Sequence, residues 1–202
     1  MHPEMPPPLP QRLQPAASGP PKLIILLALI PALIIASLIL LRVCGLIRPF
    51  SIPTNPMAPA IAAGDHIIME GFTFIFRDPC RGDIVVFKTD GIPSIPPGAL
   101  YMKRVVGLPG EHIRISAGKL FVNEQSVSLS NALGQIIYPA PSFLAGSTLL
   151  TNIDVPRGCY YVLGDYSRNS LDSRNYGCVP RKNIIGRAAF CYWPPGRVGA
   201  VK

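Results

Sequence analysis

Near its start the chain has nineteen consecutive residues without a charge, Leu23 to Leu41, bracketed by Lys22 and Arg42. As a helix rising 1.5 Å per residue, this run would span roughly 28 Å, close to the thickness of the hydrocarbon core of a bilayer. A cleaved signal peptide has a shorter apolar region that ends at small residues, whereas here Arg42 follows two leucines. The run therefore predicts a transmembrane helix over residues 23–41.

The residues before this run form a proline-rich tail. Residues 1–22 hold eight of the 24 prolines and almost no aliphatic side chains that could build a core. This composition predicts an extended or disordered segment. The run Pro6–Pro10 would fit a polyproline-binding module, but a solvated spacer is the simpler interpretation.

The charge pattern favours a lipid partner over a nucleic acid. Charged residues make up 15% of the chain, against roughly 25% in an ordinary soluble domain, so part of the apolar surface is expected to contact a membrane. The net charge is +8, but no basic run exceeds two residues, which argues against nucleic-acid binding. Arg12 and Lys22 precede the apolar run while Arg42 and Arg48 follow it, so charge alone does not orient the helix.

The cysteines and histidines do not form a metal-binding motif. The five cysteines, at positions 44, 80, 159, 178 and 191, lack Cys-x-x-Cys spacing, and the chain has three histidines. This pattern argues against a zinc finger or a histidine cluster, and no cofactor is implied. If Cys44 lies at the membrane boundary, the other four cysteines can pair in three ways, among which their spacing does not choose.

From Ser51 onward the chain consists of short apolar runs separated by turn residues. The runs are rich in β-branched and aromatic residues, and no window has the periodicity of an amphipathic helix. Ala117-Gly118 between two runs predicts a hairpin turn. We therefore expect a mainly β domain over residues 49–202, with an extended excursion from the sheet at residues 125–158. The expected strands are His66–Met69, Phe72–Phe76, Ile84–Phe87, Tyr101–Val106, His112–Ile115, Lys119–Val122, Tyr160–Leu163 and Ala188–Trp193.

Three segments place polar residues within or beside apolar strands. Ile52–Asp65 follows the apolar helix, Tyr101–Gly110 holds Lys103 among apolar neighbours, and Gly164–Gly177 is a dense polar loop. A lysine in such a strand either points into water or has lost its hydration, in which case its pKa falls and it can serve as a base or form a Schiff base. Spacing alone favours the solvated lysine.

Together these segments resemble the type I signal peptidases, the membrane-anchored Ser/Lys proteases that remove signal peptides from exported proteins. The resemblance runs from about Arg48 to Trp193 without a gap inside the motifs. Lys103–Gly110 resembles the strand that carries the base of these enzymes, and Gly164-Asp165 with Ser170–Arg174 resembles their closing motif. The resemblance implies an antiparallel β domain of signal-peptidase type behind a single membrane anchor.

The resemblance also implies a role for each matching residue. Lys103 would be the general base, kept neutral by burial, and Ser170 would orient its amine through a hydrogen bond. Asp172 and Arg174 would form a supporting ion pair. The remaining matches belong to the structural turn of the same motif: Gly164 and Asp165.

The first segment departs from the family at the nucleophile. The family pattern is Ile-Pro-Ser-Gly-Ser-Met-x-Pro-Thr-Leu, whose second Ser attacks the substrate, and this chain has Pro56 in that place. Proline has no hydroxyl to attack a carbonyl and no backbone N–H to donate to an oxyanion. Thr54 retains the hydroxyl of the other oxyanion donor, while Asn55 replaces a glycine that can adopt positive φ freely.

These losses predict a catalytically impaired protein. Removing the nucleophile of a serine protease costs roughly 10⁶ in kcat, and removing an oxyanion donor costs about 10² to 10³. Thr54 could replace the nucleophile only after repositioning, because residues two apart in an extended chain are offset by about 6 to 7 Å. Ser51 is a weaker substitute.

Three functions therefore remain open. The first is the family role, removal of signal peptides from exported preproteins, in an impaired form because of Pro56. The second is a non-catalytic binding or chaperone role for exported or surface-assembled chains. The third is a peptidase that uses Thr54 as a relocated nucleophile. In each case the expected partners are signal-peptide-bearing exported proteins and the lipid bilayer. The expected location is the cytoplasmic membrane, which the chain would span once, with the bulk of the chain outside the cytoplasm.

Overall fold

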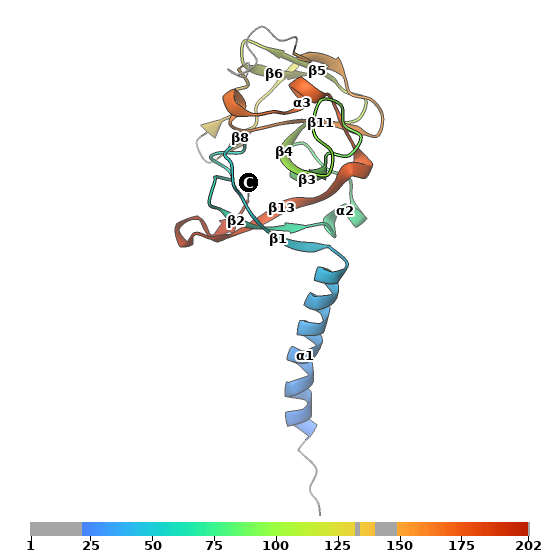
Figure 1. The fold of residues 1–202 in the computed structure, drawn as a ribbon, viewed down its shortest axis with the longest axis vertical. Coiled ribbons are helices and arrows are strands. Elements are labelled where there is room, and N and C mark those ends of the chain that lie inside the picture. The colour runs from blue at the N-terminus through green and yellow to red at the C-terminus, as the bar shows by residue number, and fades with distance from the viewer. Residues whose placement is uncertain (1–21, 132–133, 140–148, 202) are drawn as a thin grey trace, which may run out of the picture. The chain divides into compact units, whose positions relative to one another are not determined.

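A computed structural model describes residues 22–131, 134–139 and 149–201, and the chain divides into two compact units, Met1–Leu40 and Leu41–Lys202. The proline-rich tail predicted at residues 1–22 lies outside the described residues except for Lys22. The two units are described separately below (Figure 1).

The part of the first unit that the structure describes lies within a single helix, α1, which spans Lys22–Val43. The helix contains the predicted span 23–41 and continues through Pro31. Leucine, isoleucine and alanine cover all of its faces, so it has no polar side to turn to water. From Leu26 to Val43 the helix is long and apolar enough to cross a membrane, judged by length and composition.

The second unit is mainly β, as predicted, and all of its strand pairs are antiparallel within the described residues. Its largest sheet has the order β1-β2-β13-β3-β4-β11-β12, with β14 beside β13. The strands of this sheet are β1 Ile47–Ser51, β2 His66–Glu70, β3 Ile84–Lys88, β4 Leu100–Gly107, β11 Cys159–Leu163, β12 Val179–Pro180, β13 Ile184–Trp193 and β14 Gly199–Ala200.

A second sheet has the order β10-β5-β6-β7, and a two-stranded ladder joins β8 and β9. Figure 1 places β5 and β6 at one end of the second unit and β1, β2 and α2 at the other. The predicted hairpin is confirmed, because β5 and β6 are joined through Ala117 and Gly118, both at positive φ. The bounds are β5 His112–Ser116, β6 Lys119–Val122, β7 Gln125–Val127, β8 Ser130–Asn131, β9 Gly134–Gln135, β10 Asn152–Asp154, α2 Thr73–Phe76 and α3 Ser173–Tyr176.

The two larger sheets share a hydrophobic core. Val106 and Leu163 from the larger sheet pack with Ile113 and Leu120 from the smaller one. Gly107 allows this close approach, because a Cβ there would lie 2.8 Å from the Ile113 side chain. The segment predicted as an excursion at residues 125–158 contributes, where it is described, β7 and β10 to the second sheet and β8 and β9 to the separate ladder.

One predicted strand is wrong. Phe72–Phe76 was expected to be extended, but residues 73–76 form the short helix α2. The Glu70 carboxylate accepts a hydrogen bond from the backbone N–H of Thr73 at 3.0 Å and so stabilises the turn after β2. Phe74 alone among these aromatic and aliphatic side chains is buried, so the segment lacks the alternating burial of a strand.

Candidate active site

β4 carries two neighbouring basic side chains that belong to opposite faces of the sheet. Alternate residues of a strand share a face, so Lys103 lies on the side of Val105 and Arg104 on the side of Val106. Val105 and Val106 belong to different core clusters, which cover the two faces. Lys103 is 4% exposed and Arg104 is 3% exposed. Pairing with β3 in the middle of the sheet therefore buries both charges.

The amine of Lys103 has few polar contacts. Its Nζ donates a hydrogen bond to the carbonyl of Met102 at 3.1 Å and lies 5.6 Å from the centre of the Tyr101 ring. Burial removes water from the ammonium form and lowers the pKa of Lys103 to about 8, although the negative charge of Asp172 opposes this shift. The amine is therefore much more easily neutralised than that of a surface lysine. This confirms the burial expected for a base, against the solvated alternative that spacing favoured.

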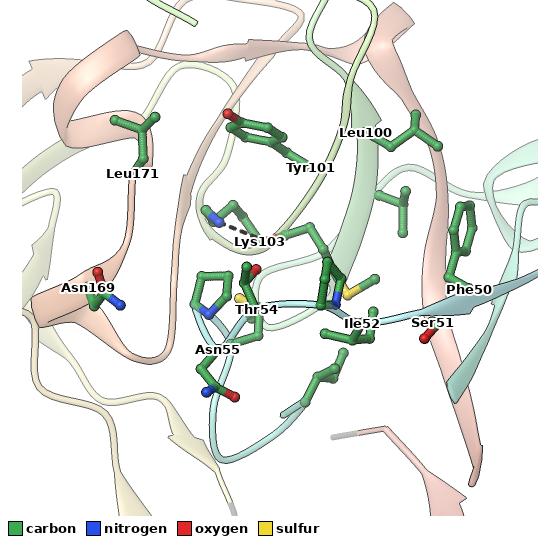
Figure 2. A pocket seen from close by; sticks show the side chains of 16 residues that line it. Phe50, Ser51, Ile52, Thr54, Asn55, Leu100, Tyr101, Lys103, Asn169 and Leu171 are labelled. Atoms are coloured by element: carbon green, nitrogen blue, oxygen red, sulfur yellow. Dashed lines mark hydrogen bonds between the residues drawn. The ribbon is translucent and has the colours of Figure 1, made fainter. Parts of the chain in front are cut away.

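A cavity of about 630 Å³ lies beside this lysine. Figure 2 shows Thr54 and Lys103 directed into it from two segments that are far apart in the sequence. Its wall combines the first and second polar segments with two residues of the third. The lining residues are Phe50, Ser51, Ile52, Pro53, Thr54, Asn55, Pro56, Met57, Ile61, Val86, Leu100, Tyr101, Met102, Lys103, Asn169 and Leu171.

Ser170 does not make the hydrogen bond to Lys103 that the resemblance implied. Its side chain is fully buried, and its Oγ has no hydrogen-bond partner among the described residues. The hydroxyl packs against Gly164, where an added Cβ would overlap Ser170 Oγ and would lie 2.6 Å from the Pro56 carbonyl oxygen. The Lys103 amine is directed to the Met102 carbonyl instead. Position 164 can therefore hold only a glycine, because any Cβ there would clash with Ser170 and Pro56.

The implied ion pair between Asp172 and Arg174 is present and buried. Two parallel hydrogen bonds of 2.8 and 2.7 Å join the guanidinium to the carboxylate, whose side chain is 0% exposed. Asp172 also accepts the backbone N–H of Gly164 at 3.1 Å and caps α3. Arg174 reaches the carbonyl oxygens of Ser167 at 2.9 Å and Pro139 at 2.5 Å. The ion pair therefore connects the polar loop that begins at Gly164, directly after β11, to the start of α3.

Asp165 has a partner that the sequence did not indicate. Its carboxylate accepts two hydrogen bonds from Arg104, at 2.8 and 2.7 Å, and both side chains are buried. Arg104 also donates to the carbonyl of Gly82 at 2.8 Å. Since Arg104 follows Lys103 on β4, this pair fixes the base-bearing strand to the closing motif. The resemblance assigned Asp165 only to a structural turn, because an ion pair between residues 61 positions apart leaves no trace in the spacing of motifs.

The segment around Pro56 is held by hydrogen bonds of its backbone and of the Asn55 side chain. The carbonyl of Pro56 accepts the N–H of Tyr166 at 3.0 Å, which connects it to the closing loop. The side-chain oxygen of Asn55 accepts the N–H of Ala63 at 2.6 Å, and Asn55 is not at positive φ. Thr54 is exposed, whereas Met57 is 2% exposed and packs in the core. Asn55 therefore stabilises a loop that needs no glycine there.

A second clamp on this segment comes from the end of the chain. Arg197 donates to the Asp65 carboxylate at 2.7 and 2.9 Å and to the Pro59 carbonyl at 2.9 Å. Asp65 also accepts the N–H of Ala62 at 2.8 Å. No motif pointed to Arg197. Arg197 holds the loop that follows Pro56, although the two lie more than a hundred positions apart in the sequence.

This arrangement places a buried amine with a lowered pKa next to a mostly apolar cavity that Pro56 also lines. Across residues 22–131, 134–139 and 149–201, no group of three or more His, Cys, Asp or Glu side chains could hold a metal ion. All five cysteines are free.

Comparison with known proteins identifies the relatives of this chain. The chain is 37% identical over 149 residues to a probable signal peptidase I-2 of Synechocystis sp., covering 73% of this chain and 64% of the relative. It is 36% identical over 151 residues to a signal peptidase I of Leptolyngbya laminosa, covering 73% and 70% of the two chains. A probable thylakoidal processing peptidase 2 of Arabidopsis thaliana is 37% identical over 161 residues, and the match covers 78% of this chain and 41% of the relative.

Among solved structures, a signal peptidase I from Enterococcus faecalis matches 56% of this chain and 98% of its own, with 29% identity and a TM-score of 0.42. The family described as "Signal peptidase, peptidase S26" matches residues 23–193, which include all of α1 except Lys22, the cavity and every residue of the candidate site named above except Arg197. The chain therefore belongs to the signal peptidase family, peptidase S26.

Proposed function

We propose that this chain is a signal peptidase I-like membrane protein whose cleft still takes signal peptides of exported proteins but which is catalytically impaired. The observation that carries the proposal is that Pro56 lines the same cavity as the buried amine of Lys103. A base with a lowered pKa is available, but the position from which the nucleophile should attack has no hydroxyl and no N–H.

Binding of an extended peptide is supported by the shape and chemistry of the cavity. Its walls are mostly apolar and include the end of the edge strand β1, the loop that follows it as far as Met57, and the start of β4. A peptide that lies beside such segments gains main-chain hydrogen bonds and places alternate side chains in pockets. A binding role for exported or surface-assembled chains needs only these features. It is the second candidate function, since neither Lys103 nor a nucleophile would take part.

The third candidate, an active peptidase that uses Thr54, is favoured by one observation. Thr54 is exposed and directed into the cavity that Lys103 also lines (Figure 2). Against it, the Lys103 amine donates to the Met102 carbonyl, and repositioning of the loop would be needed before a hydroxyl at residue 54 could replace one at residue 56.

The decisive experiment uses the full chain, purified from a host whose own signal peptidase is removed, with a precursor that carries a signal peptide. We expect binding of the precursor without cleavage after its Ala-x-Ala site. Robust cleavage by the unmodified chain would contradict impairment. Loss of that cleavage in Thr54→Val, but not in the matched control Ser51→Ala, would then assign the nucleophile to Thr54, because both hydroxyls line the cavity. Failure to bind the precursor would contradict the binding proposal.

We also propose that α1 spans the cytoplasmic membrane once, with residues 1–22 in the cytoplasm and residues 49–202 outside. The length and apolar character of α1 support the span, and the orientation follows the arrangement of the family rather than the charge count. Protease added to intact spheroplasts should degrade the large domain. Degradation only after lysis would place this domain in the cytoplasm and contradict the orientation.

A further inference from the structure

Two of the five cysteines lie on the same face of neighbouring strands. β11 and β12 pair with Cys159 opposite Pro180. Cys178 comes two residues before Pro180, so it lies on the same face as Cys159, diagonally across the ladder. Both cysteines are half-buried and pack against the same core cluster, between the two larger sheets. The residues that follow them, Tyr160 and Val179, pack in the cluster on the other face, as the alternation of a strand requires.

This placement chooses among the pairings that the spacing of the cysteines leaves open. Cys191 is buried in a third core cluster, where its thiol donates to a backbone carbonyl at 3.2 Å. Cys80 is exposed in the segment before β3, and Cys44 directly follows α1. Within the described residues, Cys159 and Cys178 are therefore the two cysteines that share a core cluster.

The two thiols also influence each other electrostatically. Burial, together with the charge of a Cys159 thiolate, raises the pKa of the Cys178 thiol to about 12. The Coulomb energy between two groups falls with the distance between them, so this influence is expected of thiols that are neighbours.

The end of the larger sheet permits the two cysteines to approach further. The Cα atoms of diagonal neighbours in a regular ladder lie roughly 7–8 Å apart, and those of a disulfide about 4.4–6.8 Å. β12, which directly follows Cys178, has two residues and is the last strand in the order of its sheet. A shift of about 1 Å therefore moves a short strand and leaves the centre of the sheet in place.

We propose that Cys159 and Cys178 form a disulfide bond when the chain meets an organic disulfide, such as that of a thiol–disulfide oxidoreductase. Cys159 attacks first, because the Cys178 thiol keeps its proton at neutral pH. The Cys159 thiolate bonds to one sulfur of the oxidant and releases the other as a thiolate. Cys178 then loses its proton and displaces the bound sulfur from Cys159. The two cysteines thus lose two protons and two electrons, and the oxidant is reduced to thiols.

The bond closes a loop around the polar segment beside the candidate site. The segment between the two cysteines contains all of Gly164–Gly177, including the buried ion pair of Asp172 and Arg174. A disulfide that closes such a loop removes conformations from the unfolded chain. For a loop of about 20 residues, the equilibrium constant of unfolding is expected to fall roughly 100-fold.

Peptide mapping of the full chain tests the bond. The chain is kept in detergent with oxidised and reduced glutathione, its remaining thiols are alkylated, and it is digested with trypsin without reduction. We expect Gly158–Arg168 joined to Asn175–Arg181, in a product that separates on reduction. Unlinked Cys159 and Cys178, whether alkylated or joined to glutathione, would overturn the proposal. So would a bond from either of them to another cysteine, or a dimer of the chain on a non-reducing gel.

Denaturant unfolding measures what the bond contributes. For each variant the readout is the ratio of its unfolding constants in reducing and oxidising buffer, so the loss of a packed sulfur, which acts in both buffers, cancels. The natural chain should show the roughly 100-fold ratio. Cys159→Ala, Cys178→Ala and the double variant should all show a ratio near one, because the bond needs both sulfurs. Cys80→Ala is the matched control and should keep the full ratio, since Cys80 is exposed and outside the cluster. A full ratio in either single variant would overturn the proposal.

The formation of this bond in the cell rests on the orientation proposed above, because disulfides persist outside the cytoplasm. Blocking thiols with a maleimide at the moment of lysis separates the two proposals. A linked pair in the chain taken from cells supports both. A pair that is blocked in cells but links in glutathione keeps the pairing and contradicts the orientation. A pair that links under neither condition overturns the disulfide, while the spheroplast and precursor experiments still decide the orientation and the proposed function.

Discussion

The two walls of the cavity beside Lys103 are built in different ways. Lys103 lines one wall. The residues behind this wall, Arg104, Asp165, Asp172 and Arg174, do not line the cavity, are nearly or fully buried and form two bidentate ion pairs. The opposite wall is the loop around Pro56, whose neighbours Thr54 and Asn55 are exposed. That loop is held by hydrogen bonds to Asn55, to the Pro56 carbonyl and to Asp65.

This difference predicts that the residue at position 56 can change while the site keeps its shape. Removing one partner of a buried ion pair leaves an uncompensated charge, which costs about 3–5 kcal/mol. A replacement at Pro56 removes no such partner, because the carbonyl that Tyr166 binds is present in every residue. Stability therefore constrains the ion-paired residues behind Lys103, whereas it does not constrain the side chain at position 56 in this way.

The largest effect is expected for Pro56→Ser, which returns both the hydroxyl and the N–H. We expect it to turn an inactive chain into one with measurable cleavage of a signal-peptide precursor. Activity should rise with pH through about 8, because Lys103 accepts a proton only in its neutral form. Lys103→Ala in the restored chain should abolish the cleavage.

The double variant Asn55→Gly, Pro56→Ser should cleave faster than the single variant if Asn55 misplaces the loop. If neither variant cleaves, residues other than 55 and 56 also prevent catalysis.

The next largest effect is expected for Asp172→Ala, which leaves the buried guanidinium of Arg174 without its carboxylate partner. We expect the free energy of unfolding to fall by about 3–5 kcal/mol, measured by denaturant unfolding in detergent. The control is Asp78→Ala, since Asp78 is exposed and pairs with Arg181 at the surface, where such a pair is worth less than about 1 kcal/mol. Similar losses in the two variants would contradict the contrast between the walls.

A smaller and opposite effect is expected for Lys103→Met. A shift of the Lys103 pKa from 10.5 to about 8 means that folding disfavours the ammonium form by about 3 kcal/mol. Between these two values the unfolded chain binds more protons, so the stability of the natural chain rises with pH in this window. Lys103→Met should therefore be more stable than the natural chain by up to about 3 kcal/mol at pH 7.

This gain should shrink as the pH approaches 10.5, where Lys103 is neutral in both states. Denaturant titrations at pH 7 and at pH 10 measure it. Lys88→Met is the matched control, because Lys88 is exposed at the end of β3 and should give little change at either pH. A gain that does not depend on pH would refute burial of the charge as its cause.

Local patterns of the sequence were sufficient for the main elements. Eight apolar runs predicted strands, and seven of them coincide with β2, β3, β4, β5, β6, β11 and β13. The exception, residues 72–76, is a helix because contacts with Glu70 and Arg181 override the β propensity of its aromatic side chains. β1 was not predicted, since three of its five residues, Arg48, Pro49 and Ser51, are polar or proline and exposed, and the strand takes its conformation from pairing with β2.

The sequence by itself determined the apolar helix, the mainly β class and the family, because each of these is carried by neighbouring residues or by a motif. That Pro56 stands at the position of the nucleophile stays a prediction of the motif. Only the tertiary structure decided that Lys103 is desolvated, that Arg104 pairs with Asp165 and that the Ser170 hydroxyl faces Gly164. The physical reason is that burial and charge pairing depend on segments more than fifty residues apart, and their distance in space is set by the packing of the sheets.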